Sequence, residues 1–274
     1  MRIDQYYSRG GFPVDIEGDP TAPAAAWRSH RRRLRAWLSA LPEEEWGRPT
    51  RCDEWDVLHL VRHLASGSQF LGYTLHMAAK GQATTRLRAF DSQTTAQDRA
   101  EELGVLDPSR ARQLLEEMDQ RTDDAMSSLS IDDWTITAEA PPGHMPAFMA
   151  VSHFVFDSWL HERDLLLPHG ERPVTVEKEA SVAARYSVGL MGAYGIDSDG
   201  ATLGVRLTDI DLELRVEHRA NRWQVMTGSG PVDASVEGRA GDVLDGGTGR
   251  DADGVRGDPA GLGILEDVAS IMAA

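Results

Sequence analysis

Histidine and aspartate recur every four residues in one stretch of the sequence, as His153, Asp157 and His161. Four residues is slightly more than one helical turn, so in a helix these side chains share one stripe of the surface. Imidazole and carboxylate groups are ligands for Zn²⁺ and for Ni²⁺, Co²⁺ or Fe²⁺. The spacing is therefore compatible both with a metal site inside a helix bundle and with the polar stripe of an ordinary amphipathic helix.

A second pair of histidines, His59 and His63, has the same four-residue spacing. The neighbouring Leu60, Val61 and Leu64 predict that at least part of this helix face is buried. Helix bundles build metal sites by bringing such pairs from two helices together in the core. Spacing alone leaves a metal site and ordinary hydrogen-bonded histidines both open.

Four helices are expected to position these residues. Apolar residues recur at intervals of three and four in four segments, 23–41, 57–79, 109–129 and 147–167. Asp56 and Asp107 precede two of these segments and are predicted N-caps, and Pro108 suits a first helical turn. Residues 82–106 show no clear period and residues 130–146 read as a loop, so the pattern predicts a four-helix bundle with one long connection.

The pattern of the chain changes after residue 170. One helical segment and three alternating runs follow, at 176–195, 201–209, 211–228 and 232–238, before a Gly- and Asp-rich remainder that closes with an apolar helix. Residues 1–20 read as an irregular lead-in. The sequence therefore predicts an α+β protein with a helical domain at 1–170 and a smaller α+β domain at 171–274.

Composition and charge argue against several partner classes. The formal net charge is -16 and the sequence pI is near 4.9, so nucleic-acid phosphates and anionic membrane surfaces would be repelled. We therefore expect a solvated face, rather than a nucleic-acid patch, from the arginines of the first helix, which are Arg28, Arg31, Arg32, Arg33 and Arg35.

Cys52 is the only cysteine, which excludes an internal disulfide and a Cys-rich zinc ribbon. No run of eighteen or more apolar residues predicts a membrane span, and residues 1–20 lack the apolar core of a signal peptide. We expect a soluble cytoplasmic protein.

Two short motifs resemble the mycothiol-dependent maleylpyruvate isomerase family, within the wider DinB-like superfamily. The run RCDEWDVLHLVRHLA resembles the family's first metal helix, with Cys52, Trp55 and His63 at the motif positions. The run DSWLHERD resembles its second signature, an acidic residue, three spacers, His, two spacers and Asp. The resemblance implies a DinB-like four-helix bundle followed by a smaller sterol-carrier-like α+β domain.

The resemblance also implies a set of metal ligands, His63, Asp157 and His161. Two departures from the family pattern stand out. The acidic ligand is usually Glu, and Asp157 has a shorter reach. The family often has an acidic residue at the position of His59, for which we expect a role behind the ligands or on the surface, with a place as a rival ligand as the alternative. His153 matches no family ligand and is expected to line the pocket or to be partly exposed.

Two further residues are expected to serve catalysis, Asp164 and Arg250. GRAGDVLDGGTGR resembles a Gly-led helix of the family that ends in Gly-Arg, which implies that the Arg250 guanidinium binds a substrate carboxylate. An exposed arginine on a mobile loop is the alternative. Asp164 is expected to orient a ligand or to form a structural ion pair with an arginine. We interpret Cys52 as a packing residue.

The implied chemistry is the activation of a thiol by a divalent metal, with Zn²⁺ as the expected ion. Three protein ligands leave a position open, and a metal lowers the pKa of a bound thiol until the reactive thiolate dominates. The resemblance names the thiol as mycothiol, which many actinobacteria use, and implies an S-transferase or a maleylpyruvate-type cis–trans isomerase that acts on a small molecule.

Two alternatives remain open at this point. One is a non-catalytic protein that binds a small molecule or an apolar ligand and retains the bundle. The other is a metal-dependent hydrolase, in which the ion activates water and Asp164 or Glu162 is the candidate general base.

Overall fold

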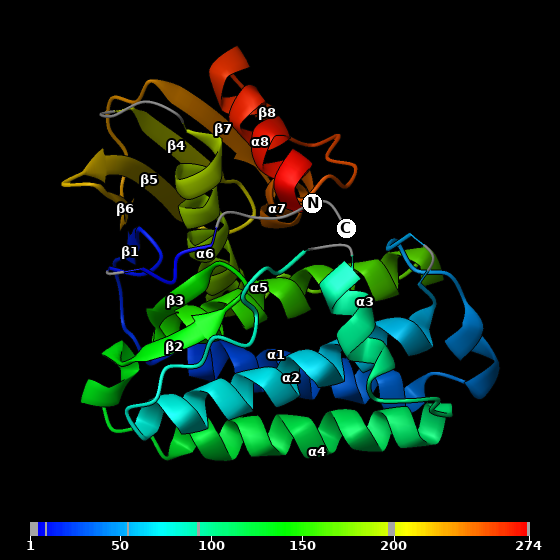
Figure 1. Cartoon of the computed structure of the whole chain (residues 1–274). Helices are drawn as coiled ribbons and strands as arrows, with labels where there is room; N and C mark the ends of the chain where they lie inside the picture. The colour runs from blue at the N-terminus through cyan, green and yellow to red at the C-terminus, as the bar shows by residue number, and fades with distance from the viewer. Residues whose placement is uncertain (1–4, 9, 54, 92–93, 197–200, 273–274) are drawn as a thin grey trace.

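The computed structural model of the chain describes residues 5–8, 10–53, 55–91, 94–196 and 201–272. Four long helices form a bundle, α1 (Ala22–Ala40), α2 (Val57–Ala79), α4 (Pro108–Ser127) and α5 (Ala147–Leu166). Helices α1 and α2 each pack against both α4 and α5, and Figure 1 shows the bundle below the strand-rich part of the chain. The predicted bundle is confirmed.

The predicted N-caps of α2 and α4 are also confirmed. Asp56 and Asp107 each accept a hydrogen bond from the backbone N–H three residues later, at 2.8 Å in both cases. Each carboxylate therefore satisfies a backbone donor that would have no partner inside its helix.

The solvated arginine face predicted for α1 is wrong for Arg31 and Arg33. Arg31 is only 2% exposed and pairs with buried Asp119 of α4. Arg33 pairs with Glu162 of α5 and with Glu179. The spacing of residues within α1 could not show these pairs, because every acidic partner belongs to another helix.

Two segments that were predicted as irregular contain short elements. These are α3 (Thr94–Glu101), the 3-10 helix Asp132–Thr135 and the antiparallel hairpin of β2 (Thr137–Ala140) and β3 (Gly143–Pro146). Glu139 in the hairpin is fully buried and accepts hydrogen bonds from the backbone N–H groups of Arg86 and Leu87 and from the Tyr7 hydroxyl. This long-range anchor orders the connection after α2, and no local period reveals it.

The C-terminal part contains a six-stranded sheet in the order β1-β6-β5-β4-β7-β8. The strands are β1 (Val14–Ile16), β4 (Thr202–Leu207), β5 (Leu212–Arg219), β6 (Arg222–Thr227), β7 (Ala234–Gly238) and β8 (Arg256–Gly257). The helices are α6 (Glu177–Gly195), α7 (Ala240–Gly246) and α8 (Pro259–Met272). Helices α6 and α8 pack on the sheet and on each other, and the predicted α+β class is confirmed.

Strand β1 comes from the lead-in that was predicted as irregular. It pairs in parallel with β6, and its Val14 is fully buried. A strand of three residues has no detectable period, so only the distant partner strand reveals it. Residues 1–4 and 9 of that lead-in lie outside the described residues.

One hydrophobic core extends through both parts of the protein. It includes Trp27 and Trp159 of the bundle, Tyr186 of α6, and Leu203 and Val236 of the sheet. A second cluster, around Trp46, Cys52 and Leu60, fills one end of the bundle. Buried side chains therefore pack across the predicted boundary near residue 170. The division into two domains at that point stays a prediction.

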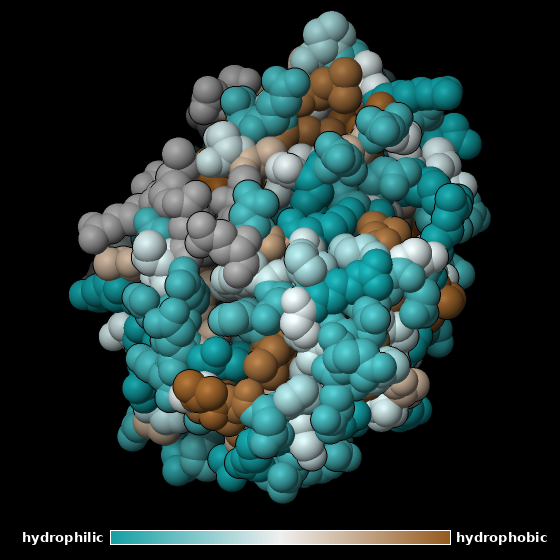
Figure 2. All heavy atoms as spheres, turned by 90° about the vertical axis from the view of Figure 1, so that its right-hand side faces the viewer, coloured by the Kyte–Doolittle hydropathy of each residue, from teal (hydrophilic) through white to brown (hydrophobic). Residues whose placement is uncertain are grey.

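The surface agrees with the charged composition. Figure 2 shows one face as predominantly hydrophilic, with hydrophobic residues in small separate groups. Among the described residues, no helix combines the length and the apolar character that a membrane span requires. The two remaining 3-10 helices are Glu43–Gly47 and Leu167–His169.

Candidate metal centre and its cavity

His63 of α2 meets Asp157 and His161 of α5 where these two helices pack together. The Nε2 atoms of His63 and His161 lie 3.4 and 3.5 Å from the Asp157 Oδ1 atom. The two imidazole rings have centroids 4.8 Å apart at 78°. The structure therefore brings together the three ligands that the resemblance implied, with donor atoms from all three within 4.8 Å of one another.

The spacing of these atoms fits a tetrahedral ion. Zinc lies about 2.0–2.2 Å from nitrogen and oxygen ligands, so two ligand atoms on one edge of the tetrahedron are about 3.3–3.6 Å apart. The separations of 3.4 and 3.5 Å fall in this range. A hydrogen bond between an imidazolium and a carboxylate is shorter, about 2.7–2.9 Å. The residues thus fit a divalent ion with one coordination position left open.

The electrostatics of the three groups favour an ionised Asp157 and a positive charge beside it. Burial alone would raise the pKa of Asp157, but the imidazoles of His63 and His161 hold it well below its usual range. Burial alone would lower the pKa of His161, but Asp157 and Cys52 raise it well above its usual range. A bound divalent ion would take the place of the proton, because histidine binds metals as neutral imidazole.

Asp164 holds His161 from behind. Its Oδ2 atom lies 2.9 Å from His161 Nδ1, the nitrogen that faces away from Asp157. Arg250 donates to both carboxylate oxygens at 2.7 and 2.8 Å, and Arg51 donates at 3.0 Å. Burial alone would raise the pKa of Asp164, but hydrogen bonds from His161 and Arg250 keep it well below its usual range. A carboxylate in this position orients a metal-binding histidine and fixes its tautomer.

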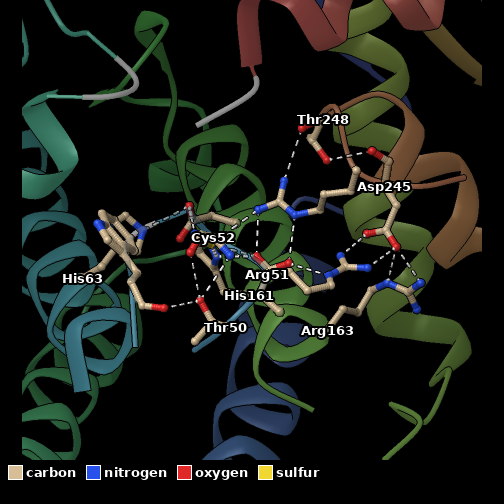
Figure 3. Close-up of polar contacts among 12 residues, drawn as sticks. Thr50, Arg51, Cys52, His63, His161, Arg163, Asp245 and Thr248 are labelled. Carbon is tan, nitrogen blue, oxygen red and sulfur yellow. Dashed lines mark hydrogen bonds and ion pairs between the residues drawn. The ribbon is translucent and has the colours of Figure 1, made fainter. Parts of the chain in front are cut away.

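Arg51, Arg163 and Asp245 are a part of the site that the sequence did not predict. Asp245 of α7 is buried and accepts two hydrogen bonds from Arg51, at 2.8 and 3.0 Å, and two from Arg163, at 2.7 and 3.1 Å. Figure 3 shows both arginines converging on Asp245 beside His161 and Cys52. All three residues lie inside quoted runs that resemble the family, Arg51 and Arg163 in the two metal-helix motifs and Asp245 in GRAGDVLDGGTGR, which was a usable signal.

Cys52 does more than fill space. It belongs to a hydrophobic cluster, as the packing interpretation requires, but its Sγ atom also lies 3.3 Å from an oxygen of Asp164. The same sulfur is 3.7 Å from His161 Nδ1 and 3.8 Å from a nitrogen of Arg250. Packing therefore describes only part of its surroundings.

The other two histidines lie outside the ligand set. His59 is exposed, and its Nδ1 lies 2.7 Å from the carboxylate of its own helix cap, Asp56. His153 is buried and lines the cavity, with Nδ1 3.0 Å from the Tyr186 hydroxyl. Burial lowers its pKa to about 4, so His153 is neutral near pH 7.

The three ligands open into a cavity of about 430 Å³ between the bundle and the C-terminal part. Most of its walls come from α2, α5 and the connection after α2, and Thr248, Arg250 and Met272 close it from the C-terminal side. Arg250 therefore reaches the cavity rather than standing on an exposed loop, and its side chain is 12% exposed.

Comparison with known proteins agrees with this geometry. The family model described as "Mycothiol maleylpyruvate isomerase N-terminal domain" matches residues 27–166, just over half of the chain. A crystal structure of the mycothiol-dependent maleylpyruvate isomerase is similar, with 20% identity, a TM-score of 0.59, and coverage of 88% of this chain and 93% of that one. A mutant of that enzyme gives 19% identity, a TM-score of 0.60 and the same coverage.

A search of curated proteins gave no match. At 19–20% identity, the two crystal structures show a common fold. The family match covers all three candidate ligands and the carboxylate behind them. On that match, the chain belongs to the mycothiol maleylpyruvate isomerase N-terminal domain family.

Proposed function

We propose that this protein is a metal-dependent enzyme that activates a low-molecular-weight thiol, mycothiol, and transfers it to an electrophile or uses it to isomerise one. The observation that carries the proposal is the candidate ligand set of His63, Asp157 and His161, in which both nitrogen–oxygen separations match a tetrahedral edge and which opens into a cavity. The solved relatives act with mycothiol on maleylpyruvate, as their names state.

The donor set suits Zn²⁺, which would supply the positive charge that lowers the pKa of the thiol. The protein's own residues set the geometry. His161 is held by Asp164, which stays ionised because Arg51 and Arg250 neutralise it.

We propose that Asp164 and Arg250 act through His161 rather than on the substrate. Arg250 uses Nε and Nη2 on Asp164, and these are the two donors of its side-on bidentate face. This arrangement supports a positioning role for both residues.

The hydrolase alternative receives less support. Asp164 is occupied by Arg51, Arg250 and His161. Glu162 is buried and pairs with Arg33 on the α1 side. Neither carboxylate is placed to take a proton from water at the ligand set.

The carrier alternative requires an apolar cavity in the C-terminal part. The second cavity of the described chain lies on the sheet, and charged side chains of Arg206, Glu213 and Arg215 contribute to its walls. The candidate ligand set has no counterpart among the described residues that line this second cavity.

The test is bound metal per chain, measured by elemental mass spectrometry on protein purified without a His tag. We expect about one equivalent in the wild type and almost none in the Asp157→Ala/His161→Ala double variant. His59→Ala is the matched control, because it removes an exposed histidine of α2 that is four residues from His63. Thiol-dependent turnover should follow the metal. Metal retained by the double variant, or a loaded protein without thiol-dependent turnover, would contradict the proposal.

A further inference from the structure

The cavity has two chemically different ends. At one end, His63 of α2 faces His161 of α5. At the other end, Phe70, seven residues after His63, faces Phe154, seven residues before His161, with ring centroids 6.1 Å apart. Seven residues correspond to about 10 Å along a helix. The aromatic pair therefore lies about 10 Å from the candidate ligands, within the same cavity.

The residues of α2 that line the cavity between its two ends have small side chains or none. Ser66 and Gly67 of α2 line the cavity between His63 and Phe70. A Cβ atom at Gly67 would lie 3.4 Å from the ring of Phe154. Glycine at this position therefore keeps a passage open from the ligand set to the aromatic end.

Further apolar residues complete the aromatic end. Leu87, Phe90, Pro141 and Pro142 line the same cavity from the connection after α2 and from the hairpin. Gln5 holds these two segments together, since its side chain donates to the carbonyl oxygens of Leu87 and Pro141 at 2.6 and 2.8 Å. This wall is tied by long-range hydrogen bonds and is therefore a constructed part of the cavity.

One arginine, Arg99, stands at the aromatic end of the described cavity lining. Of the described lining residues, Arg250 and Arg99 are the arginines, and Arg250 is paired with Asp164. The Arg99 guanidinium stands over the Phe70 ring at 5.4 Å and donates to the carbonyl of Arg86. An anionic group placed here would lose water, and its nearest arginine in the described lining would be Arg99, which already stacks on Phe70.

We infer that the electrophile carries a neutral aromatic or similarly apolar group, which lies between Phe70, Phe90 and Phe154, and not a carboxylate at that end. This inference rests on the proposed thiol chemistry. For an aryl enone, the thiolate lone pair forms a C–S bond at the β-carbon and the C=C π pair moves to the carbonyl as an enolate. The α-carbon then takes a proton from water, which gives the S-adduct.

The test uses the metal-loaded full chain, mycothiol and three electrophiles. But-3-en-2-one reports thiol addition alone, 4-phenylbut-3-en-2-one adds the ring, and its 4-carboxyphenyl analogue adds a charge at the far end. Each kcat/KM is divided by the uncatalysed rate constant. We expect the phenyl compound to exceed the carboxyphenyl compound at least tenfold.

Two substitutions on α5 sharpen this result. Phe154→Leu should lower the normalised kcat/KM for the phenyl compound at least fivefold and leave that for but-3-en-2-one within twofold. Phe148→Leu is the matched control, because Phe148 packs against the core outside the cavity lining. Equal or better use of the carboxyphenyl compound would overturn the inference. If the wild type uses the carboxyphenyl compound as well as or better than the phenyl compound and Arg99→Leu does not, Arg99 is an anion site.

A binding measurement separates failure of the inference from failure of the proposed function. Unreactive 4-phenylbutan-2-one and its carboxyphenyl analogue are titrated into wild type and Phe154→Leu by calorimetry. If no electrophile turns over but the phenyl ketone binds more tightly than its analogue in a Phe154-dependent way, the aromatic end stands and the thiol chemistry fails. If but-3-en-2-one turns over but the phenyl compound is not preferred to its carboxyphenyl analogue in turnover or in binding, the thiol chemistry stands and the inference about the aromatic end fails.

Discussion

Helix α5 contributes to two histidine–carboxylate clusters that have similar composition and different surroundings. In the sealed cluster, His30 of α1 is fully buried, with Nε2 2.9 Å from the Ser158 hydroxyl and Nδ1 3.0 Å from Arg33. Glu162 and Glu179 lie 3.6 Å from the same ring and are both paired with Arg33. Every charge in this cluster has a partner supplied by the chain.

In the open cluster, the two histidines stand 3.4 and 3.5 Å from Asp157, further than a charge-assisted hydrogen bond, and they face a cavity. No arginine pairs with Asp157 among the described residues. The difference teaches that residue type and helical spacing do not distinguish a structural cluster from a reactive one. An internal arginine closes the first cluster, whereas the second leaves room for a cation from solution.

The largest expected effect is in the open cluster. His161→Ala should lower thiol-dependent turnover at least a thousandfold and remove the bound metal, because two ligands cannot hold the ion tightly. Steady-state kinetics and elemental analysis measure both. Far-UV circular dichroism should be unchanged. Turnover close to wild type in the variant would place the chemistry elsewhere.

The sealed part of the bundle should respond in stability and not in metal binding. Arg31 donates to Ser158 of this cluster and to buried Asp119, and removing it leaves Asp119 with only the longer 3.7 Å ion pair to Arg35. Arg31→Met should reduce the free energy of unfolding by about 3–5 kcal/mol, measured by urea denaturation. The Arg31→Met/Asp119→Asn double variant should recover part of that loss. Metal content should remain near one equivalent, and its loss would contradict the separation of the two clusters.

Asp164→Asn tests the support behind the ligands. The amide keeps the shape but loses the charge that orients His161 and pairs with Arg250. We expect metal affinity to fall about 10–100-fold, as is typical when the partner behind a ligand is removed. Competition with a chelator measures it. An unchanged affinity would show that packing alone orients His161.

The smallest expected effect concerns His153, which is buried like the sealed cluster but lines the cavity like the open one. Burial depresses its pKa to about 4, and Asp157, His63 and Tyr186 face it. The unfolded chain therefore binds a proton on this group near pH 6.5 while the folded protein does not, so its contribution to stability is present above pH 6.5 and is lost as the pH falls. The expected loss is about 1 kcal/mol between pH 6.5 and 5.5.

His153→Phe should remove that part of the pH dependence. Denaturant unfolding at a series of pH values compares the two slopes, and only their difference reports on His153, because other groups titrate in the same range. Equal slopes would show that His153 is protonated as easily in the folded protein as in the unfolded chain.

Local patterns predicted much of the fold. The period of apolar residues placed the bundle helices to within two residues, and Asp56 and Asp107 marked two of their starts. The alternating runs predicted β4 to β7. These features depend on neighbours a few residues apart, so the sequence shows them directly.

The features that were missed depend on distant partners. Strand β1 forms because β6 pairs with it across more than 200 residues of sequence. In the hairpin, Glu139 accepts hydrogen bonds from the backbone N–H groups of residues 86 and 87, more than 50 residues earlier. Arg31 is buried and Arg33 is partly buried because acidic residues on α4, α5 and α6 meet them. No period within one helix records such a meeting.

The sequence by itself determined which residue types share a helix face and, through its two motifs, that His63, Asp157 and His161 belong together. Only the tertiary structure decided their separation, the cavity beyond them and the chain of ion pairs from Asp164 through Arg51 to Asp245. Helical spacing is a local property of the backbone. Distances between helices depend on how every side chain in the core packs, and that is settled only when the whole chain is folded.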